Sequence, residues 1–573
     1  MTRLNPHHAL VLVATLAVAF AQVAAAQEPQ QRPLRPPSVP LVTHDPYFSI
    51  WSNSDRLTHD WPKHWTGATH SLSGLVRVDG KVLRFMGNWR DTDPMEQESL
   101  DVTPTRTTYA FRGHGVRVVL SFLSPLLPDD LDVQSRPVTY VTLTASSADG
   151  KPHAVQLYFD AAAEIAVNTP EQQVAWKRES VEGMEVMRVG SQDQPVLQKA
   201  GDNLRIDWGY LYVAVPKQEG AQLRTVIAAD VAARGGFAKG GALPEKDDDR
   251  MPRPAGRDWP VLAAAWDLGQ VARQPVTRQV MLAYDPLESI QLMGRNLKPY
   301  WRRGGLDATG LLKVAAREHR DVDRRCDEFD KKLLADARAA GGEPYARLVA
   351  LAYRQTLAAH GLVADESGKP LHFSKENFSN GCIGTVDVIY PASPFFLLLN
   401  PSLLKAQLVP VLEYAQSPRW KFPFAPHDLG TYPKANGQVY GGGERNERDQ
   451  MPVEESGNML IMMAALAKVE GNADFARQYW PLMTKWAEYL RDKGMDPENQ
   501  LSTDDFAGHL ARNTNLSIKA IVALGGYAQL CERLEKKDEA AQYRKLAEGM
   551  AAKWQQMAAD GDHYVLAFGS PGT

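Results

Sequence analysis

The stretch EESGNMLIMM, residues 454–463, decides the fold. Its two acids open a segment with helical spacing that runs from Glu454 to Glu470. Met459 to Met463 are five consecutive apolar residues, which predicts a helix buried all round rather than one with a single apolar face. Such a helix must pack against neighbours on both sides, so the sequence predicts a helical domain around it.

The helical pattern continues on either side of this stretch. Glu454–Glu470 and Ala473–Lys493 form one predicted hairpin, and Asn513–Leu534 with Asp538–Met557 forms another. Successive hairpins of roughly 60 residues, joined by long loops, favour an α/α toroid in which an outer ring of helices surrounds an inner ring. Loops from one end line the cavity of such a toroid, where ligands normally bind. Further helices are predicted upstream, at 311–339, 344–360 and 402–416.

Before Pro286 the apolar pattern has a period of two residues. Leu75–Val78 and Val82–Phe85 flank the turn pair Asp79-Gly80, which predicts a β-hairpin. Many short strands with glycine and proline between them predict a β-sandwich of two packed sheets. Gly235–Arg257 is rich in glycine, proline and charge, and is predicted to be a long surface loop. The other predicted strands are 116–122, 138–143, 154–159, 210–215, 223–228 and 279–284.

The N-terminus has the pattern of an export signal. A polar start precedes the apolar run Ala9–Phe20, and Ala24-Ala25-Ala26 offers a cleavage site before Gln27. Twelve apolar residues are too few to span a bilayer, so we expect a signal peptide over 1–26 and an exported protein, periplasmic or extracellular. Five prolines between Gln27 and Pro40 predict a tether over 27–40.

Composition excludes several classes of protein. The 573 residues are 44% hydrophobic and 23% charged, with 64 basic against 68 acidic side chains. This is an ordinary globular composition, and the net charge of −4 argues against a nucleic-acid partner. The three cysteines, Cys326, Cys382 and Cys531, lie too far apart in the sequence for a metal-ligand motif. An odd number of cysteines also does not indicate a disulfide framework. We also expect no membrane partner, and the sequence leaves the oligomeric state open.

Four loop stretches of the helical half concentrate acids, aromatics and glycines. They are 374–396, 426–433, 451–459 and 501–509. Hydrolysis needs one group that protonates the leaving atom and another that activates water or attacks, and two carboxylates in a cavity can divide these roles. The predicted catalytic residues are Asp428, Glu454, Glu455, Asp504 and Asp505, and the predicted substrate-binding residues are Asp387, Glu376, His427, Tyr432 and Asn458.

Each candidate also has a structural interpretation. Asp428 can form a turn before Gly430. Glu454 or Glu455 can interact favourably with the helix dipole in the first turn of a helix. Two adjacent acids are not expected to face the cavity together. Asp504 and Asp505 can cap a loop, Asp387 can pair with a buried partner, and Lys375 with Glu376 can be a surface ion pair. Trp51, Trp61 and Trp65 with His59, His64 and His70 form a cluster that favours packing between modules over sugar stacking.

The chain resembles the glutaminase A family of secreted fungal and bacterial proteins. The resemblance covers essentially the whole mature chain and rests on six runs. They are PLVTHDPYFSIWS (40–52), HWTG (64–67), TVDVIYPASPFF (385–396), HDLG with PVEESGNM (427–430 and 452–459), and DDFAG (504–508). The resemblance implies a short N-terminal module, a β-sandwich and a six-hairpin toroid like that of several glycosidases. It also implies deamidation of L-glutamine. It does not identify any catalytic residue in this sequence.

The expected protein is therefore a multidomain β + α hydrolase. Its expected domains are a short module at 41–90, a β-sandwich at 91–305 and an α/α toroid at 306–573 that looks incomplete at its C-terminus and truncated relative to the family. The leading substrate is L-glutamine, and the alternatives are a glycoside hydrolase of six-hairpin type and a non-catalytic carbohydrate-binding protein. We expect no cofactor and no metal, although Ca²⁺ in the acidic loops is an option because oxygen ligands abound.

Overall fold

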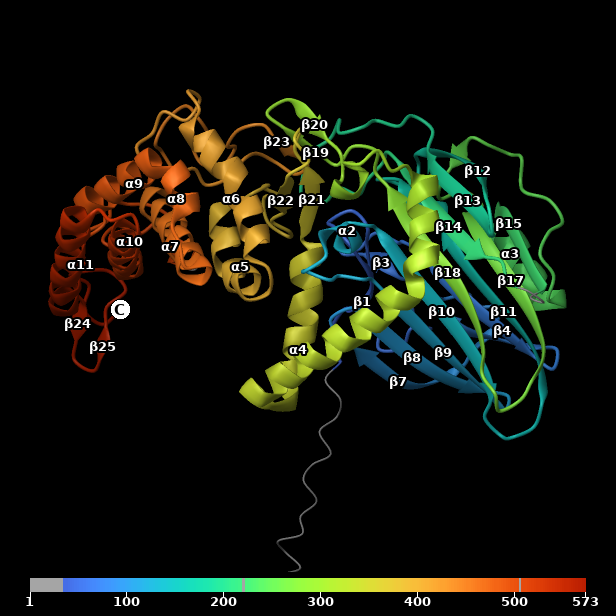
Figure 1. The fold of residues 1–573 in the computed structure, drawn as a ribbon. Coiled ribbons are helices and arrows are strands. Elements are labelled where there is room, and N and C mark those ends of the chain that lie inside the picture. The colour runs from blue at the N-terminus through green and yellow to red at the C-terminus, as the bar shows by residue number, and fades with distance from the viewer. Residues whose placement is uncertain (1–34, 219–221, 504–506) are drawn as a thin grey trace, which may run out of the picture. The chain divides into compact units, whose positions relative to one another are not determined.

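Two mostly antiparallel sheets face each other in the first half of the chain (Figure 1). The computed structural model describes residues 35–218, 222–503 and 507–573, and Ser38–Thr573 forms one compact unit. The predicted signal peptide and most of the tether lie outside the described residues. Among those described, one sheet has nine strands in the order β16 (Arg253–Pro254), β12 (Gln173–Val181), β13 (Met184–Ser191), β14 (Tyr210–Pro216), β18 (Val276–Asp285), β10 (Val138–Ser147), β9 (Val116–Leu123), β8 (Arg106–Gly113) and β7 (Glu96–Val102).

The second sheet has six strands within the described ranges. The predicted hairpin is confirmed as β4 and β5, which pair in antiparallel register from Leu75 opposite Arg84 to Val78 opposite Lys81. Residues 72–86 therefore belong to the sandwich sheet itself. The strand order is β15 (Gln222–Ala229), β17 (Pro260–Val271), β11 (His153–Ala162), β4 (Leu72–Val78), β5 (Lys81–Met86) and β6 (Asp93–Pro94).

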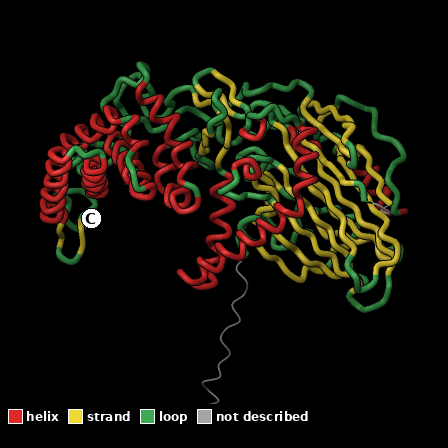
Figure 2. The backbone as a smooth tube through the Cα atoms, in the orientation of Figure 1, coloured by secondary structure: helices red, strands yellow, loops and turns green. Residues whose placement is uncertain are grey.

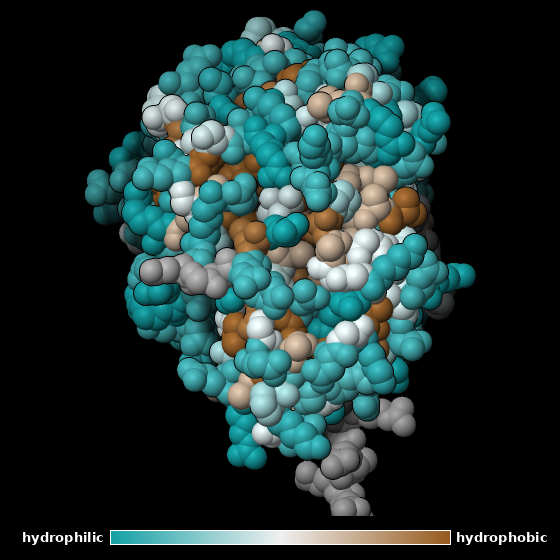
Figure 3. Space-filling model, turned by 90° about the vertical axis from the view of Figure 1, so that its right-hand side faces the viewer, coloured by the Kyte–Doolittle hydropathy of each residue, from teal (hydrophilic) through white to brown (hydrophobic). Residues whose placement is uncertain are grey.

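Period-two alternation gives both sheets two buried faces. Along β11, Leu157 and Phe159 enter the core between the sheets, whereas Tyr158 faces outward against Phe237 of α3 (Asp230–Gly240). The outer face of the nine-stranded sheet packs against the first arm of α4 (Ala308–Ala358). The prediction of a surface loop from Gly235 was wrong for its first part, because the completely buried Phe237 holds this segment as a helix on the sheet. The exterior of the sandwich side is mainly hydrophilic (Figure 3).

Helix α4 links the sandwich to the helical half. It breaks only at Gly342, whose φ of 79° is left-handed and suits glycine. Beyond the break, the Tyr353 hydroxyl donates to the carbonyl of Leu126 at 2.5 Å, and Arg354 Nε donates to Thr43 Oγ1 at 2.8 Å. The two helices predicted at 311–339 and 344–360 are thus two arms of one element, each attached to a different part of the sandwich and N-terminal strands.

The predicted hairpins are confirmed in the helical half (Figure 2). Helices α5, α7 and α10 contact one another in sequence and form the inner layer, and each packs against an outer helix, α6, α9 or α11. The predicted arm 473–493 is two helices, because the chain breaks at Tyr479 before Pro481. The bounds are α5 (Val386–Leu399), α6 (Pro401–Gln416), α7 (Pro452–Glu470), α8 (Asp474–Gln478), α9 (Trp480–Lys493), α10 (Thr514–Arg533) and α11 (Lys537–Ala558).

Helix α7 is enclosed as its sequence predicts. Met459 and Met463 are at most 1% exposed, and α7 touches helices on several sides. The prediction of a loop at 386–396 was wrong, since this segment is α5 despite Pro391 and Pro394. Pro394 has no N–H for the carbonyl of Tyr390, and Ser393 Oγ donates to that carbonyl instead at 2.7 Å.

The remaining elements are short. The N-terminal strands form a small sheet, and others lie at the junctions and near residue 560. They are β1 (Val39–Thr43), β2 (Ser49–Ser52), β3 (Lys63–His64), α2 (Leu131–Gln134), η1 (Ala163–Ala166), β19 (Ile290–Leu292), β20 (Arg295–Leu297), η2 (Tyr300–Arg302), β21 (His360–Ala364), β22 (Pro370–Ser374), β23 (Lys434–Ala435), β24 (Ala559–Asp560) and β25 (His563–Tyr564).

Candidate active site

The beginnings of the three inner helices bring charged side chains together. Asp387 lies in the first turn of α5, Glu454 and Glu455 lie in the first turn of α7, and Lys519 lies in the second turn of α10. We call these four residues, together with His427 from the loop before β23, the acid cluster. The cluster combines three of the four loop stretches that the sequence singles out, so residues far apart in the chain form one site.

Glu454 forms the inner wall of the acid cluster. Its side chain is completely buried and forms an ion pair with Lys519 Nζ. Thr503 Oγ1 donates to Glu454 Oε1 at 2.7 Å, and Asn458 Nδ2 donates to the same oxygen at 3.1 Å. Because the carboxylate is neutralised by a lysine and held by two further donors, Glu454 is suited to positioning.

Glu455 lies beside Asp387 and His427. Donor atoms of Glu455, Asp387 and His427 all lie within 4.8 Å of one another. Glu455 Oε2 accepts from Asn458 Nδ2 at 3.1 Å, while its buried Oε1 has no hydrogen-bond partner among the described residues. Burial, and then the negative charges of Asp387 and Glu454, raise the pKa of Glu455 well above its usual range. Glu455 therefore tends to carry a proton, which a catalytic acid must.

His427 and Asp428 form a buried pair behind Asp387. His427 Nδ1 lies 3.0 Å from Asp428 Oδ2, and its Nε2 lies 3.7 Å from Asp387 Oδ1. Burial opposes the imidazolium, but the hydrogen bond to Asp428 and the charges of Asp387, Asp428 and Glu376 outweigh it, so the pKa of His427 is raised. The Tyr440 ring stacks on the imidazole at 4.1 Å. His427 is thus held in one orientation toward Asp387.

Asp428 itself has a structural environment. Its Oδ1 accepts from the backbone N–H groups of Gly430 at 2.8 Å and Val439 at 3.0 Å, and its Oδ2 accepts from the N–H of Tyr440 at 3.1 Å. The side chain is 1% exposed. Asp428 therefore forms the turn that one interpretation of the sequence predicts, and it orients His427 rather than facing a cavity.

Glu376 lies at the edge of the acid cluster. It is partly exposed, Thr385 Oγ1 donates to it at 3.4 Å, and its charge acts on His427. The surface ion pair with Lys375 was a wrong alternative, because the Lys375 side chain is fully buried and pairs with Asp202 at 2.7 Å. Lys375 Nζ also lies 4.7 Å from the centre of the Trp65 ring. Thus the sandwich and the N-terminal segment both contribute side chains next to the site.

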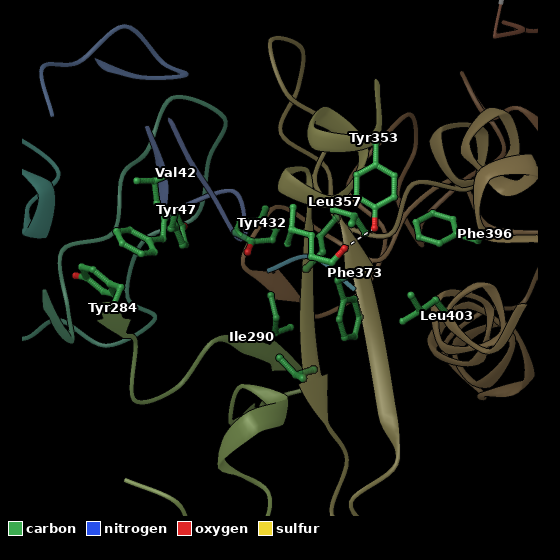
Figure 4. Packing of buried hydrophobic residues seen from close by; sticks show 14 of the residues in the cluster. Val42, Tyr47, Tyr284, Ile290, Tyr353, Leu357, Phe373, Phe396, Leu403 and Tyr432 are labelled. Carbon is green, nitrogen blue, oxygen red and sulfur yellow. Dashed lines mark hydrogen bonds between the residues drawn. The ribbon is translucent and has the colours of Figure 1, made fainter. Parts of the chain in front are cut away.

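Tyr432 is not part of the acid cluster. Its ring packs edge-on against Tyr47 at 5.2 Å, in the core between the N-terminal strands and the helical half (Figure 4). Its hydroxyl lies close to Gly361 of β21, where an added Cβ would come within 3.2 Å of it. Asp504 and Asp505, two of the predicted catalytic residues, lie outside the described residues.

Lys519 and Tyr440 are site residues that the sequence argument misses. A lysine in the predicted helix 513–534, whose neighbours Leu516 and Ala520 are apolar, is a signal for a buried charge. Tyr440 precedes the glycine run Gly441–Gly443 and carries no such signal. A three-dimensional contact is needed to place either residue.

The same groups are the ones able to hold a metal ion. Asp387, His427 and Glu455 form one set of possible donors in the described part of the chain, and Cys382, His427 and Asp428 form another. The second set suits a cation less, because burial and neighbouring acids raise the pKa of the Cys382 thiol and keep it protonated.

The arrangement can carry out acid–base chemistry. An accessible carboxylate, Asp387, lies beside a buried acid that favours its protonated form, Glu455. A carboxyl group that keeps its proton and a more exposed carboxylate beside it can act as acid and base in one reaction. Fold and site together define a hydrolase with a β-sandwich and a helical-hairpin domain.

Comparison with known families agrees with this class. Residues 342–573 match the Glutaminase A six helical-hairpin domain. Two domains of unknown function, DUF5127 and DUF4964, match residues 105–336 and 11–96. A bacterial glucoamylase in complex with acarbose is a distant structural neighbour, with 10% sequence identity, a TM-score of 0.45, and coverage of 93% of this chain and 70% of that one.

Two curated fungal relatives align over nearly the whole chain. Glutaminase A of Aspergillus oryzae is 34% identical over 558 residues, which cover 94% of this chain and 79% of the relative. A protein of Arthroderma benhamiae named "Probable glutaminase" is 28% identical over 634 aligned residues, which cover 93% of this chain and 71% of the relative. The chain belongs to the glutaminase A family, as its sequence motifs indicate. Among the described helices, none is long and apolar enough to cross a membrane.

Proposed function

We propose that the protein hydrolyses the side-chain amide of L-glutamine to L-glutamate and ammonia, with Asp387 as general base and Glu455 as general acid. The observation that carries this proposal is the convergence of Asp387, His427 and Glu455 within 4.8 Å. The name of the Aspergillus oryzae relative supports glutamine as the substrate. Asp504 and Asp505 stay candidates from the sequence alone.

The proposed reaction proceeds in two steps. Asp387 removes a proton from water while the water oxygen bonds to the amide carbon, which gives a tetrahedral intermediate. Glu455 then donates its proton to the amide nitrogen, the C–N bond breaks, and ammonia leaves. The proton on Asp387 returns to Glu455 through solvent, so the enzyme is unchanged at the end. His427, fixed by Asp428, keeps Asp387 oriented, and Lys519 with Glu454 holds the wall of the site.

Ammonia release from L-glutamine tests the proposal. We expect turnover by the full chain and a loss of about 10²–10⁴-fold in kcat for Glu455→Gln, which keeps the shape of the side chain but cannot donate an acid proton. Glu498→Gln is the matched control, because Glu498 is exposed and its side chain forms a surface ion pair with Lys493. Equal turnover in Glu455→Gln and the control would refute the role of Glu455.

Glycoside hydrolysis is the second candidate function. It is favoured by the short distance between the Asp387 and Glu455 carboxyl groups, since retaining glycosidases hold their two carboxyl groups only about 5–5.5 Å apart. Release of reducing sugar from a glycan panel, without ammonia from glutamine, would support it. Sugar binding with neither product would instead favour a non-catalytic binding protein.

We also propose that the protein is exported. The apolar run and the Ala24-Ala25-Ala26 motif support cleavage before Gln27. N-terminal sequencing of the protein recovered outside the cytoplasm should begin at Gln27, and a mature protein that retains Met1 would contradict this.

A further inference from the structure

A pocket separate from the acid cluster lies in the sandwich half. It has a volume of about 300 Å³, at the lower end of the range for small-molecule sites. Its walls come from the segment after β3, from η1 with the loop that follows it, and from Arg205. None of these walls belongs to the acid cluster. The residues that matter for the argument are His70, Glu164, Asn168 and Arg205.

Several buried polar atoms around this pocket have no partner among the described residues. They are both ring nitrogens of His70, Oε2 of Glu164 and Nε of Arg205. His70 is 1% exposed and Glu164 is 9% exposed, so water does not freely solvate them. Buried polar groups are normally hydrogen-bonded, and a gathering of unpartnered donors and acceptors around one pocket is the environment that a polar ligand satisfies.

Two opposite charges at the pocket also lack counter-ions. Arg205 donates to the backbone carbonyls of Asn203 and Asn168, which are neutral, and it forms no ion pair within the described ranges. Burial lowers the pKa of Arg205, which agrees with the lack of a nearby carboxylate. Glu164 likewise forms no ion pair with a described residue, and burial raises its pKa to about 7.

The surroundings of each charge are fixed by other contacts. Among neighbouring cations, Arg234 is the one whose charge lowers the pKa of Glu164. Its guanidinium, however, donates to both carboxylate oxygens of Asp160, each at 2.8 Å. His70 cannot supply a cation, since burial and Arg205 lower its pKa to about 3. The pocket therefore offers one cation, one carboxyl group and neutral imidazole nitrogens.

We propose that this pocket binds a free α-amino acid as its zwitterion, with the ligand carboxylate at Arg205 and the ligand ammonium at Glu164. A zwitterion supplies both missing counter-charges at once. A neutral sugar would satisfy hydrogen bonds but would leave both charges uncompensated. The proposal does not depend on the acid cluster, and it assigns the pocket a ligand whether or not the cluster hydrolyses glutamine.

Binding of L-glutamine, measured by calorimetry on the full chain, tests the assignment. Asp387→Asn is used as the background, so that hydrolysis does not consume the ligand, and the Glu164 and Arg205 variants then report the pocket's own share of the binding. We expect Glu164→Gln, which keeps the side-chain shape, to weaken binding at least tenfold. L-glutaminamide, which lacks the carboxylate, and 4-carbamoylbutanoic acid, which lacks the ammonium, should both bind at least tenfold more weakly than L-glutamine.

Arg205→Lys separates charge from structure. Lysine keeps the positive charge but cannot make both backbone contacts, so amino-acid binding should be retained in part, whereas Arg205→Met should abolish it. Thermal unfolding of each variant shows whether the fold persists. Unchanged L-glutamine affinity in folded Glu164→Gln and Arg205→Met would overturn the proposal, as would tighter binding of D-glucose than of L-glutamine.

Discussion

His427 Nε2 lies 3.7 Å from Asp387 Oδ1, while Nδ1 of the same ring lies 3.0 Å from Asp428 Oδ2. One imidazole thus joins a fully buried carboxylate to a partly accessible one. The buried partner is anchored by three backbone N–H groups, so its position is fixed by the loop itself. Asp428 therefore orients the His427 ring, and Asp387 is the carboxylate of this pair that can contact substrate.

Asp387→Asn is expected to lower kcat by about 10²–10⁴-fold and to leave thermal unfolding nearly unchanged. The amide keeps the volume of the side chain but cannot accept a proton from water. Asp492→Asn is the control for the loss of one surface acid, because Asp492 is exposed and pairs with its neighbour Arg491. A folded Asp387→Asn with full turnover would remove Asp387 from the reaction.

Lys519→Met is expected to lower the free energy of unfolding by about 3–5 kcal/mol, because it leaves the Glu454 carboxylate buried without its cation. Chemical denaturation measures the change. Lys332→Met is the control, since that lysine is 80% exposed and should matter by less than about 1 kcal/mol. Adding Glu454→Gln to Lys519→Met should restore part of the loss, and a further loss would contradict the buried-pair explanation.

Stability should depend on pH through Asp330. Burial raises its pKa to about 6, against the opposing hydrogen bonds from Thr103 and Thr105. Because the folded pKa exceeds the unfolded value near 3.8, the folded state keeps a proton that the unfolded state releases. This contribution is fully present below about pH 4 and is lost as the pH rises to about 6, for a total of about 3 kcal/mol. In Asp330→Asn the decline between these pH values should disappear from the unfolding curves.

Removal of divalent metal should leave turnover unchanged. The proposed reaction uses proton transfers between carboxyl groups and water, and no step requires a cation. Activity after dialysis against EDTA, compared with activity after dialysis against buffer, is the measurement. A loss that added Ca²⁺ or Zn²⁺ reverses would instead identify Asp387, His427 and Glu455 as ligands, because their donor atoms lie within 4.8 Å of one another.

Tyr432→Phe should retain turnover with an unchanged KM for L-glutamine. Its ring packs in the interior against Tyr47, away from the acid cluster, so the loss of the hydroxyl affects packing alone. Tyr440→Ala provides the contrast, because it removes the ring stacked on His427 and should reduce kcat. A large rise in KM for Tyr432→Phe would restore the interpretation of Tyr432 as a substrate-binding residue.

Strong periodicity made most of the fold predictable. Alternation identified β11 and β18, and helical spacing identified α7 and α10, because each buries a regular pattern of apolar residues. Strand β7 was missed because most of its residues stay at least partly exposed, which leaves no alternation in the sequence. Helix α5 was missed because its two prolines favour a loop, and the Ser393 contact that offsets one of them is invisible in a pattern.

The sequence indicated which stretches carry the acids but not how their side chains meet. The density of acids pointed to the stretches that contain Asp387, His427, Glu454 and Glu455, and these residues converge in the structure. Both adjacent glutamates are buried, and Asn458 donates to each of them. Lys519 neutralises the buried Glu454 carboxylate. Because Lys519 belongs to α10 and Glu454 to α7, no local sequence pattern predicts this ion pair.

The single glycine break of α4 also has a practical consequence for anyone who wishes to cut the molecule in two. Its first arm supplies an outer layer of the sandwich, and its second arm is fastened to Leu126 and Thr43. A cut at Gly342 would expose apolar surface on both fragments. The separately expressed halves should therefore fold poorly and aggregate. In the intact protein the two halves should unfold in a single calorimetric transition, because α4 connects them and packs against both.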